Sequence, residues 1–333
     1  MNKKRLISGI KPTGNLTLGN YIGAILNFKK FQDEYECLYF VADLHSLTTN
    51  EISPEELKRT RKEIIAWYLA AGIDPEKTII FYQSDITELG LAQWVIANET
   101  TIGELNRMTQ FKDKTQKLTK MENGTLKIPT GLLFYPTLMA TDILIYNADI
   151  VPIGEDQTQH LELTRNIGQR INKKYKLNFK IPNGLVPKVG AKIKSLIDPN
   201  VKMSKSDKNS KGVIYLNDDP TVAYNKILKA VTDSENKIYI SEDKPGILNL
   251  LNIYAALENI SLEQAQEKFK DKNYGEFKLA VAEIVKKTLT DLQSKYNQFL
   301  PIVDQIAKNN VQKAKRICVP FIDELMKKRG FEY

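Results

Sequence analysis

The chain has 333 residues, 42% of them hydrophobic and 26% charged, a composition that is typical of a globular protein with one or two hydrophobic cores. Lys and Arg number 48 against 40 Asp and Glu, and the formal net charge of +8 favours an anionic partner, although a solvated Lys-rich surface explains it equally well. The only two cysteines are far apart and form no C-x-x-C motif, which argues against a disulfide framework and a Cys-based zinc site. No segment approaches the roughly 20 apolar residues of a membrane span. We therefore expect a cytoplasmic protein that binds no membrane.

In the first half of the chain, short apolar runs alternate with segments of helical periodicity. Ser53 followed by Pro54 is a good helix start, because the hydroxyl can cap the helix and proline suits its first position. The alternation predicts βαβ units and therefore an α/β fold, a Rossmann-like doubly wound parallel sheet with helices on both faces. The apolar runs cover 6–10, 37–42 and 78–83, and the helical segments cover 18–31, 54–71 and 89–100.

The second half of the sequence becomes almost wholly helical. The change predicts a Rossmann-type catalytic domain over 1–195, a mobile loop over 196–215 and a helical appendage over 216–333, some of whose helices pack back on the sheet. The expected elements are a Lys-rich loop at 112–127, a helix at 131–144, a strand at 150–153, a helix at 157–175, a second Lys-rich loop at 198–212, and helices beyond 221 that end with 275–299 and 302–328.

Glycines cluster in the turn at 8–20, which follows the first predicted strand and leads into a helix. Gly9, Gly14 and Gly19 let the backbone approach a ligand, and the helix start offers N–H groups to an anion, so the turn is a candidate nucleotide site. It contains no G-x-G-x-x-G, and Asn20 stands where a P-loop requires lysine. A plain strand-to-helix turn explains the segment equally well.

A second candidate is the sequence Lys-Met-Ser-Lys-Ser at 202–206, in the later Lys-rich loop. Two ammonium groups and two hydroxyls on such a loop can close over a triphosphate and stabilise the charge that moves onto a leaving pyrophosphate. Taken alone, a solvated loop is the usual explanation of such a run.

Together, these two segments resemble the signature motifs of class I aminoacyl-tRNA synthetases. Residues 12–20 are similar to the first motif, with Thr17 and Asn20 where many members have histidines, and 202–206 match the second motif letter for letter. The Thr-x-Gly-Asn turn resembles that of the tryptophanyl enzymes. The resemblance covers essentially the whole chain and implies a tryptophan–tRNA ligase of the bacterial type; further segments that agree are 103–112, 135–144 and 149–157.

The resemblance implies that the two motifs face each other across one molecule of ATP. Lys11 and Lys194 stand where many relatives have glutamine and methionine, which leaves details of the nucleotide contact open. The implied ATP contacts are Lys11, Pro12, Thr13, Gly19 and Asn20 at the adenosine and phosphates, Gly154, Glu155 and Asp156 at the ribose, Ile193 near the adenine, and Lys202, Met203, Ser204, Lys205 and Ser206 in the second motif.

The implied reaction is an in-line attack of the tryptophan carboxylate on the α-phosphorus of ATP, with magnesium pyrophosphate leaving. A carboxylate is already ionised at neutral pH, so no general base is needed, and catalysis consists of positioning and charge stabilisation. We expect Mg²⁺ to arrive with the ATP phosphates and no separate metal site on the protein. The candidate catalytic residues are Lys114, Lys202, Lys205, Thr17 and Asn20.

Tyr135, Met139 and Asp142 have the spacing i, i+4 and i+7, which places them on one side of the predicted helix. From the spacing alone, Tyr135 and Met139 read as core residues and Asp142 as a surface or capping acid. The resemblance makes this side the tryptophan pocket, with Asp142 accepting the indole N–H. It also implies that the pocket contains Gln157, Val151, Ile153, His45 and Ile7, and leaves His160 structural.

The resemblance also implies transfer of the activated tryptophan to tRNA(Trp) by a two-fold homodimer. The alternatives are a tyrosyl-tRNA synthetase and a catalytically silent relative that only binds tRNA, and the intact lysines of the second motif argue against the silent relative. A dinucleotide-binding oxidoreductase would need a fingerprint that the chain lacks. Basic side chains of the C-terminal helices can bind phosphates, although a solvated face explains each one alone: Lys308, Lys313, Lys315, Arg316, Lys327, Lys328 and Arg329.

Overall fold

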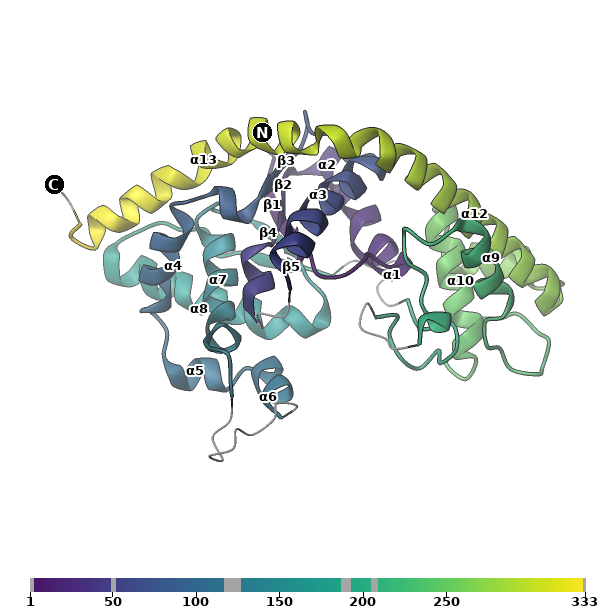
Figure 1. Cartoon of the computed structure of the whole chain (residues 1–333). Helices are drawn as coiled ribbons and strands as arrows, with labels where there is room; N and C mark the ends of the chain where they lie inside the picture. The colour runs from purple at the N-terminus through teal and green to yellow at the C-terminus, as the bar shows by residue number, and fades with distance from the viewer. Residues whose placement is uncertain (1–2, 49–51, 117–126, 187–192, 205–208, 332–333) are drawn as a thin grey trace.

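The computed structural model describes residues 3–48, 52–116, 127–186, 193–204 and 209–331, and its centre is a parallel five-stranded sheet (Figure 1). The strand order is β3-β2-β1-β4-β5, which confirms the predicted α/β fold and its four predicted strands. The short β5, at the edge of the sheet, was not predicted. The strands are β1 (Arg5–Ile10), β2 (Glu36–Val41), β3 (Ile79–Tyr82), β4 (Ile150–Pro152) and β5 (Asn183–Leu185).

Helices cover both faces of the sheet, as the alternation along the chain predicted. Because successive side chains of a strand point to opposite faces, Leu6 and Tyr39 pack in one hydrophobic cluster and Ile7 and Phe40 in the other. The first cluster includes residues of α1 (Leu18–Asn20), the π-helix η1 (Tyr21–Ile25), α2 (Leu26–Glu34) and α3 (Pro54–Ala70); the second includes residues of α4 (Leu89–Ala97), α7 (Thr130–Leu144) and α8 (Thr158–Tyr175).

Local signals set several helix boundaries. The predicted cap of α3 is confirmed, since the Ser53 hydroxyl accepts a hydrogen bond from the Glu56 amide at 3.1 Å. The predicted Lys-rich loop at 112–127 is partly wrong, because 112–115 belong to helix α6 (Thr109–Thr115), which follows α5 (Ile102–Asn106). Residues 117–126 of that prediction lie outside the described residues.

The C-terminal helices share a core with the sheet. The first hydrophobic cluster continues from Leu6 into residues such as Ile253, Phe277 and Leu289. The helices are α9 (Pro220–Leu228), α10 (Pro245–Glu258), α11 (Leu262–Phe269), α12 (Tyr274–Phe299) and α13 (Val303–Lys328), and the short 3₁₀ segments of the molecule are Leu44–Thr48, Gln83–Asp85, Glu155–Gln157, Ser210–Gly212 and Leu300–Ile302.

Helix α13 spans the molecule, from the end of α12 to the neighbourhood of α4 (Figure 1). It packs along the edge strand β3, where it covers backbone groups that another chain could otherwise pair with. Val303 and Ala307 belong to the first hydrophobic cluster, and Ile322 and Leu325 to the second. Beyond its end, Arg329 donates a hydrogen bond to the Tyr175 hydroxyl at 2.6 Å, so both ends of this helix are fixed.

Both cysteines, Cys37 and Cys318, are free thiols with no exposed surface. Burial raises their pKa values to about 11 and about 12. Within the described ranges, none of the helices combines the length and apolarity that a membrane crossing requires.

Candidate active site

A cavity of about 340 Å³ opens at the carboxyl ends of β1 and β4. The strand order reverses between these two strands, because β2 and β3 follow β1 on one side and β5 follows β4 on the other. Ligands of open α/β sheets bind at such a reversal of strand order. Every residue that was predicted to bind the amino acid lines this cavity: Ile7, His45, Tyr135, Met139, Asp142, Val151, Ile153 and Gln157. Lys11, Lys114 and Gly154 complete it with Ser8, Gly9, Phe40, Ala42, Thr48, Ile143 and Pro152.

The predicted side of helix α7 faces the cavity. Tyr135, Met139 and Asp142 all line it, which confirms that their spacing brings them to one side. Asp142 is 2% exposed, so its interpretation as a surface or capping acid is wrong. A buried carboxylate in a mostly apolar wall is stable only with hydrogen-bond partners.

Asp142 receives those partners from two neighbouring strand ends. His45, after β2, has its Nε2 at 2.9 Å from Oδ2, and Gln83, after β3, donates through Nε2 to Oδ1 and Oδ2 at 2.8 and 2.9 Å. Burial raises the pKa of Asp142, and the contacts with His45 and Gln83 oppose that rise. The carboxylate is thereby held in one orientation at the cavity wall.

Gln83 was missed by the sequence interpretation. It is 1% exposed, and its amide oxygen accepts a hydrogen bond from the Leu44 backbone at 3.1 Å, which fixes the direction of the amide group. A glutamine after a strand has no distinctive pattern, and its partner Asp142 lies far along the sequence. The one available signal was its place at the carboxyl end of a strand, the same position that drew attention to His45.

The hydroxyl of Tyr135 belongs to a second network of hydrogen bonds at the cavity. Its hydroxyl lies 2.7 Å from Nε2 of His160 and 3.2 Å from Oε1 of Gln110, and Gln110 in turn donates to the backbone and side-chain oxygens of Asp156, both at 3.2 Å. His160 is 1% exposed, and burial, with a smaller contribution from the charge of Lys114, lowers its pKa to about 4. His160 is therefore neutral at physiological pH and does not line the cavity.

Lys114 reaches the cavity from α6, with its ammonium group 5.1 Å from the centre of the Tyr135 ring. The residue is exposed, but its ammonium group has lost part of its water, and this loss lowers its pKa. Helix α6 has no side-chain cap of its own. Gln159 of α8 supplies one, since its Oε1 accepts the Thr109 N–H at 2.8 Å and its Nε2 donates to the Arg107 carbonyl at 3.3 Å.

A second cavity, of about 510 Å³, adjoins the first and shares Ser8, Gly9, Pro152, Ile153 and Gly154 with it. At two of these glycines, an added Cβ would come close to a neighbouring side chain. A Cβ at Gly9 would lie 2.7 Å from the Phe40 ring, and one at Gly154 would lie 2.7 Å from Oδ1 of Asp156. The remaining lining comes from the end of β1, η1, α2, the 3₁₀ segment before α8, the residue after β5, and the second motif: Ile10, Gly23, Ala24, Asn27, Phe28, Phe31, Asp156, Val186 and Lys202.

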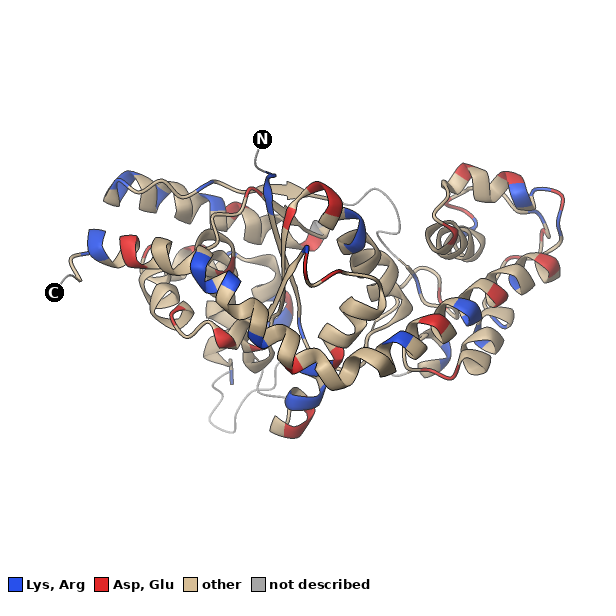
Figure 2. Cartoon of the chain, turned by 90° about the horizontal axis from the view of Figure 1, so that it is seen from above, with Lys and Arg blue, Asp and Glu red and all other residues tan. Residues whose placement is uncertain are grey.

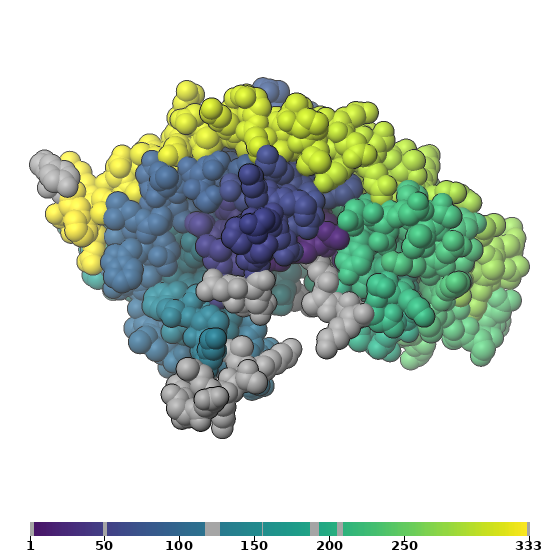
Figure 3. All heavy atoms as spheres, viewed as in Figure 1, coloured from purple at the N-terminus to yellow at the C-terminus, as the bar shows by residue number. Residues whose placement is uncertain are grey.

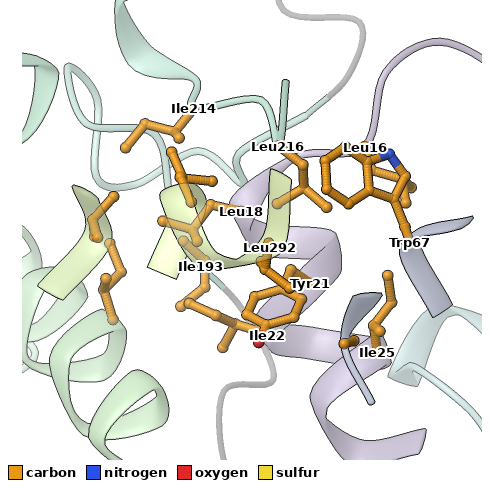
Figure 4. Packing of buried hydrophobic residues seen from close by; sticks show 14 of the residues in the cluster. Leu16, Leu18, Tyr21, Ile22, Ile25, Trp67, Ile193, Ile214, Leu216 and Leu292 are labelled. Carbon is orange, nitrogen blue, oxygen red and sulfur yellow. The ribbon is translucent and has the colours of Figure 1, made fainter. Parts of the chain in front are cut away.

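The two sequence motifs are neighbours in the structure, and their placement on either side of one molecule of ATP stays a prediction. A Cβ at Gly19 would lie 3.5 Å from that of Ile193 and 3.7 Å from that of Met203. Leu16 and Leu18 of the first motif pack among Ile193, Ile214 and Leu216 (Figure 4). In the view of Figure 3, the surface is hollowed between the part coloured teal and the part coloured green.

The segment before the second motif is fixed from α10. Asn249, which is 4% exposed, accepts the Lys194 N–H at 2.8 Å and donates to the Lys194 carbonyl at 3.0 Å. The Lys194 ammonium group donates to the Asn200 carbonyl at 3.1 Å, and Lys194 pairs with Lys202 in an isolated bridge. The lysine that replaces methionine here thus stabilises the hairpin of the motif itself. Asn249 carried no signal in the sequence.

Several other predicted site residues line neither cavity. Thr17 and Asn20 form a capping box at the start of α1, in which each side chain accepts a hydrogen bond from the other residue's backbone, and Thr17 is fully buried. Ile193 and Met203 are each 2% exposed, and the buried Pro12 accepts a hydrogen bond from Thr60. Lys205, Ser206 and the Glu155 side chain lie outside the described residues.

The predicted phosphate-binding residues of the C-terminal helices are not all available. Lys315 forms an ion pair with Glu88 at 3.0 Å, and Arg329 is held by Tyr175. Figure 2 shows Lys and Arg interspersed with Asp and Glu over the helices. Among the described residues, no group of three or more His, Cys, Asp or Glu side chains could hold a metal ion.

Comparisons with known proteins agree with this geometry. The family model described as "tRNA synthetases class I (W and Y)" matches residues 1–290. The chain is 58% identical, over 99% of both chains, to a tryptophan–tRNA ligase of Mycoplasmopsis pulmonis.

Solved structures of similar proteins share the whole fold. The crystal structure of tryptophanyl-tRNA synthetase from Mycoplasma pneumoniae is similar with a TM-score of 0.91 and 40% identity over 98% of both chains. The Campylobacter jejuni enzyme, complexed with ADP and tryptophan, is similar with a TM-score of 0.80 and 29% identity over 98% of this chain and 99% of that one. The chain therefore belongs to the class I aminoacyl-tRNA synthetases and, within them, to the bacterial-type tryptophan–tRNA ligases, which use ATP.

Proposed function

We propose that the first cavity binds L-tryptophan, that the adjoining cavity binds ATP, and that tryptophanyl-adenylate forms where they meet. The observation that carries this proposal is the nearly fully buried Asp142 in a cavity of otherwise mostly apolar lining. Among aromatic amino acids, tryptophan offers an indole N–H to such an acceptor and phenylalanine offers none. An unpaired buried carboxylate would penalise phenylalanine.

In this arrangement the indole ring lies between apolar side chains, with Asp142 at its nitrogen. Ile7, Met139, Val151 and Ile153 supply the walls, and Gln157 contacts the amino-acid backbone groups. His45 acts on the indole through Asp142, whose carboxylate it orients. The pocket therefore recognises tryptophan by the hydrogen bond from its indole N–H and by the shape of its ring.

We place ATP in the adjoining cavity, which Gly9 of the turn at 8–20 lines. Asp156 and Gly154 line it on the side that we assign to the ribose, and Lys202 lies on the same cavity. The Thr17–Asn20 capping box gives the first motif its turn, so we assign these two residues a positioning role at the phosphates. Lys205 and Ser206, from the resemblance, complete the phosphate contacts.

The reaction is an attack of the tryptophan carboxylate on the α-phosphorus, with pyrophosphate leaving together with the Mg²⁺ that arrives on ATP. Lys11 and Lys114 line the amino-acid cavity and Lys202 the adjoining one, so positive charge is available on both sides of the reacting phosphate. Catalysis consists of this charge and of positioning, because the attacking carboxylate needs no base.

The activated tryptophan is then transferred to the 3′ end of tRNA(Trp). We assign the catalytic steps to residues 1–195, closure over ATP to 196–215 and tRNA contacts to the helices of 216–333, whose basic side chains suit a phosphate backbone. A homodimer and a cytoplasmic location rest on the resemblance to the family.

Pyrophosphate exchange into ATP, measured separately with tryptophan, tyrosine and phenylalanine, tests this proposal. We expect exchange with tryptophan alone. The Lys202→Ala variant should lower the exchange rate by about two orders of magnitude and leave tryptophan affinity within roughly twofold, because Lys202 lines only the nucleotide cavity.

Exchange with tyrosine alone would overturn the substrate assignment, and exchange with none of the three would favour the silent relative. An equal loss of nucleotide and tryptophan binding in Lys202→Ala would overturn the assignment of the two cavities.

A further inference from the structure

A continuous chain of hydrogen bonds runs from the nucleotide cavity to a buried histidine behind the amino-acid cavity. Asp156 accepts from Gln110, Gln110 contacts Tyr135 at 3.2 Å, and Tyr135 contacts His160 at 2.7 Å. The four residues come from α6, α7, α8 and the turn before α8. Two of them, Tyr135 and Asp156, each line one of the cavities.

The partners in this chain fix the position of each proton. Both contacts of Gln110 with Asp156 are to acceptors, so its NH₂ group points to Asp156 and its amide oxygen to Tyr135. The Tyr135 hydroxyl therefore donates its single proton to Gln110. It follows that His160 must donate to Tyr135, which places the histidine proton on Nε2.

The other ring nitrogen supports this assignment. Nδ1 of His160 is buried and has no hydrogen-bond partner among the described residues. A buried N–H without an acceptor is rarer and less favourable than a buried lone pair without a donor. The neutral form with the proton on Nε2 is thus the form that leaves no N–H unpaired.

We propose that His160 is a positioning residue for the amino group of the substrate, because it holds the Tyr135 hydroxyl with its proton turned away and one oxygen lone pair available to an ammonium group. A tyrosine oxygen has one proton and two acceptor sites, and His160 and Gln110 use the proton and one acceptor site. The remaining site can only accept, which suits an ammonium donor. This inference rests on the proposed placement of tryptophan in the cavity.

His160 should therefore contribute to the affinity for ligands that carry an amino group, and not to the affinity for ligands that lack it. Without His160, the hydroxyl loses the donor that sets its direction, and the bond to the ammonium group weakens. The indole ring and the carboxylate contact other residues and are unaffected. A ligand that lacks the amino group, indole-3-propionate, therefore serves as an internal control for general damage to the cavity.

The test is calorimetric titration of the full-length protein with tryptophan and with indole-3-propionate. In His160→Leu we expect tryptophan to bind roughly tenfold more weakly, about 1.4 kcal/mol, with indole-3-propionate within about twofold of wild type. In His160→Gln, whose amide nitrogen reaches the position of Nε2 and donates from it, tryptophan affinity should return to within about threefold of wild type.

A second variant avoids the core. Gln110 lies on the short surface helix α6, so Gln110→Met should fold normally, and it removes the acceptor of the Tyr135 proton. We expect the same selective loss for tryptophan. Gln93→Leu is the matched control, because it removes a hydrogen bond to Thr137 on the same helix as Tyr135 from a side chain that lines neither cavity.

Equal weakening of both ligands in His160→Leu and Gln110→Met, or unchanged tryptophan binding, would overturn the role of His160. Failure of the underlying placement is distinguishable with Asp142→Asn. If that variant binds both indole ligands as wild type does, the cavity is not the tryptophan site; if it loses both, only the inference about His160 is at stake.

Discussion

At Asp142, a carboxylate inside the protein accepts hydrogen bonds from His45 and Gln83 before any ligand is present. Because the carboxylate only accepts, His45 carries its proton on Nε2. These donors oppose the rise in pKa that burial causes and so favour the charged form of the acid, in which it binds an indole N–H most strongly. Recognition by Asp142 therefore depends on side chains that do not themselves meet the indole nitrogen.

Gln83→Met should make tryptophan recognition sensitive to acid. The carboxylate loses two hydrogen bonds, so its pKa, already raised by burial, rises further, and the charged form is lost at a higher pH as the solution is acidified. We expect kcat/KM for tryptophan to fall by roughly tenfold at neutral pH and by more below it, because the indole bond to the charged carboxylate, which contributes about 1.5 kcal/mol, is weakened. The measurement is pyrophosphate exchange as a function of pH.

Gln93→Met is the control for this series. Gln93 donates a hydrogen bond to Thr137, which lies on α7 as Asp142 does but on another side of that helix. Its pH profile should follow that of wild type. A Gln83→Met profile that is lower at every pH by one constant factor would contradict the assigned effect on Asp142.

At the scale of elements, α6 depends on another helix for its position. Its backbone is capped by Gln159 of α8, and it carries Lys114 to the cavity. A short helix has little stability of its own, so a cap from outside determines where its side chains point. The position of Lys114 is thus set from the helix that also carries His160.

Gln159→Ala should lower the rate of adenylate formation without weakening tryptophan binding. Loss of a cap costs about 1 kcal/mol, and a less ordered α6 presents Lys114 in the reactive position for less of the time. We expect a roughly five- to tenfold slower single-turnover rate and tryptophan affinity within about twofold. Gln305→Ala, which removes an exposed side-chain bond to Asn309 on α13, should have no effect on either. A normal rate in Gln159→Ala would show that α6 is ordered without this cap.

The elements that the sequence predicted well are those whose burial pattern is local. The runs at 6–10 and 37–42 are apolar because both faces of the strands are covered, and the Ser53 cap acts within one turn. Helix α6 and strand β5 were not predicted, because α6 is held by Gln159 and β5 by pairing with β4. Neither partner is visible in the short segment itself.

The same distinction applies to the cavity. The side of α7 that carries Tyr135 and Asp142 follows from helical spacing, which a sequence contains. Gln110 and Asn249 act through partners that are distant along the chain, and nothing in their neighbours marks them, whereas Gln83 is marked only by its place at the end of a strand. Resemblance supplied the residues that line the cavity, including His45, and only the structure showed that Gln83 and Gln110 bind Asp142 and Tyr135.

At the scale of the whole molecule, the positive charge of the chain should affect the transfer of tryptophan to tRNA much more than the formation of the adenylate. The chain has a formal net charge of +8, and basic side chains lie along its C-terminal helices. Contacts with the phosphates of a nucleic acid weaken steeply with salt, whereas a small ligand in a cavity is affected much less.

We therefore expect KM for tRNA to rise strongly as salt is added, with a log–log slope of about 0.7–0.9 for each phosphate contact. Pyrophosphate exchange, which needs no tRNA, should change by less than about twofold over the same range. Lys308→Ala should reduce the slope, and Lys315→Ala, whose ammonium group is paired with Glu88, should not. Equal salt dependence of both reactions would contradict an ionic contribution of these helices.

The burial of Cys37 and Cys318 makes the native chain a convenient background for spectroscopic probes. With no exposed surface and thiol pKa values of about 11 and about 12, neither sulfur reacts readily with a maleimide dye at neutral pH. A cysteine introduced on the surface of α8 and another on α11 would then take up a fluorophore pair without removal of the native thiols. Energy transfer between those dyes would report in real time how the helical part moves relative to the sheet while ATP and tryptophan bind.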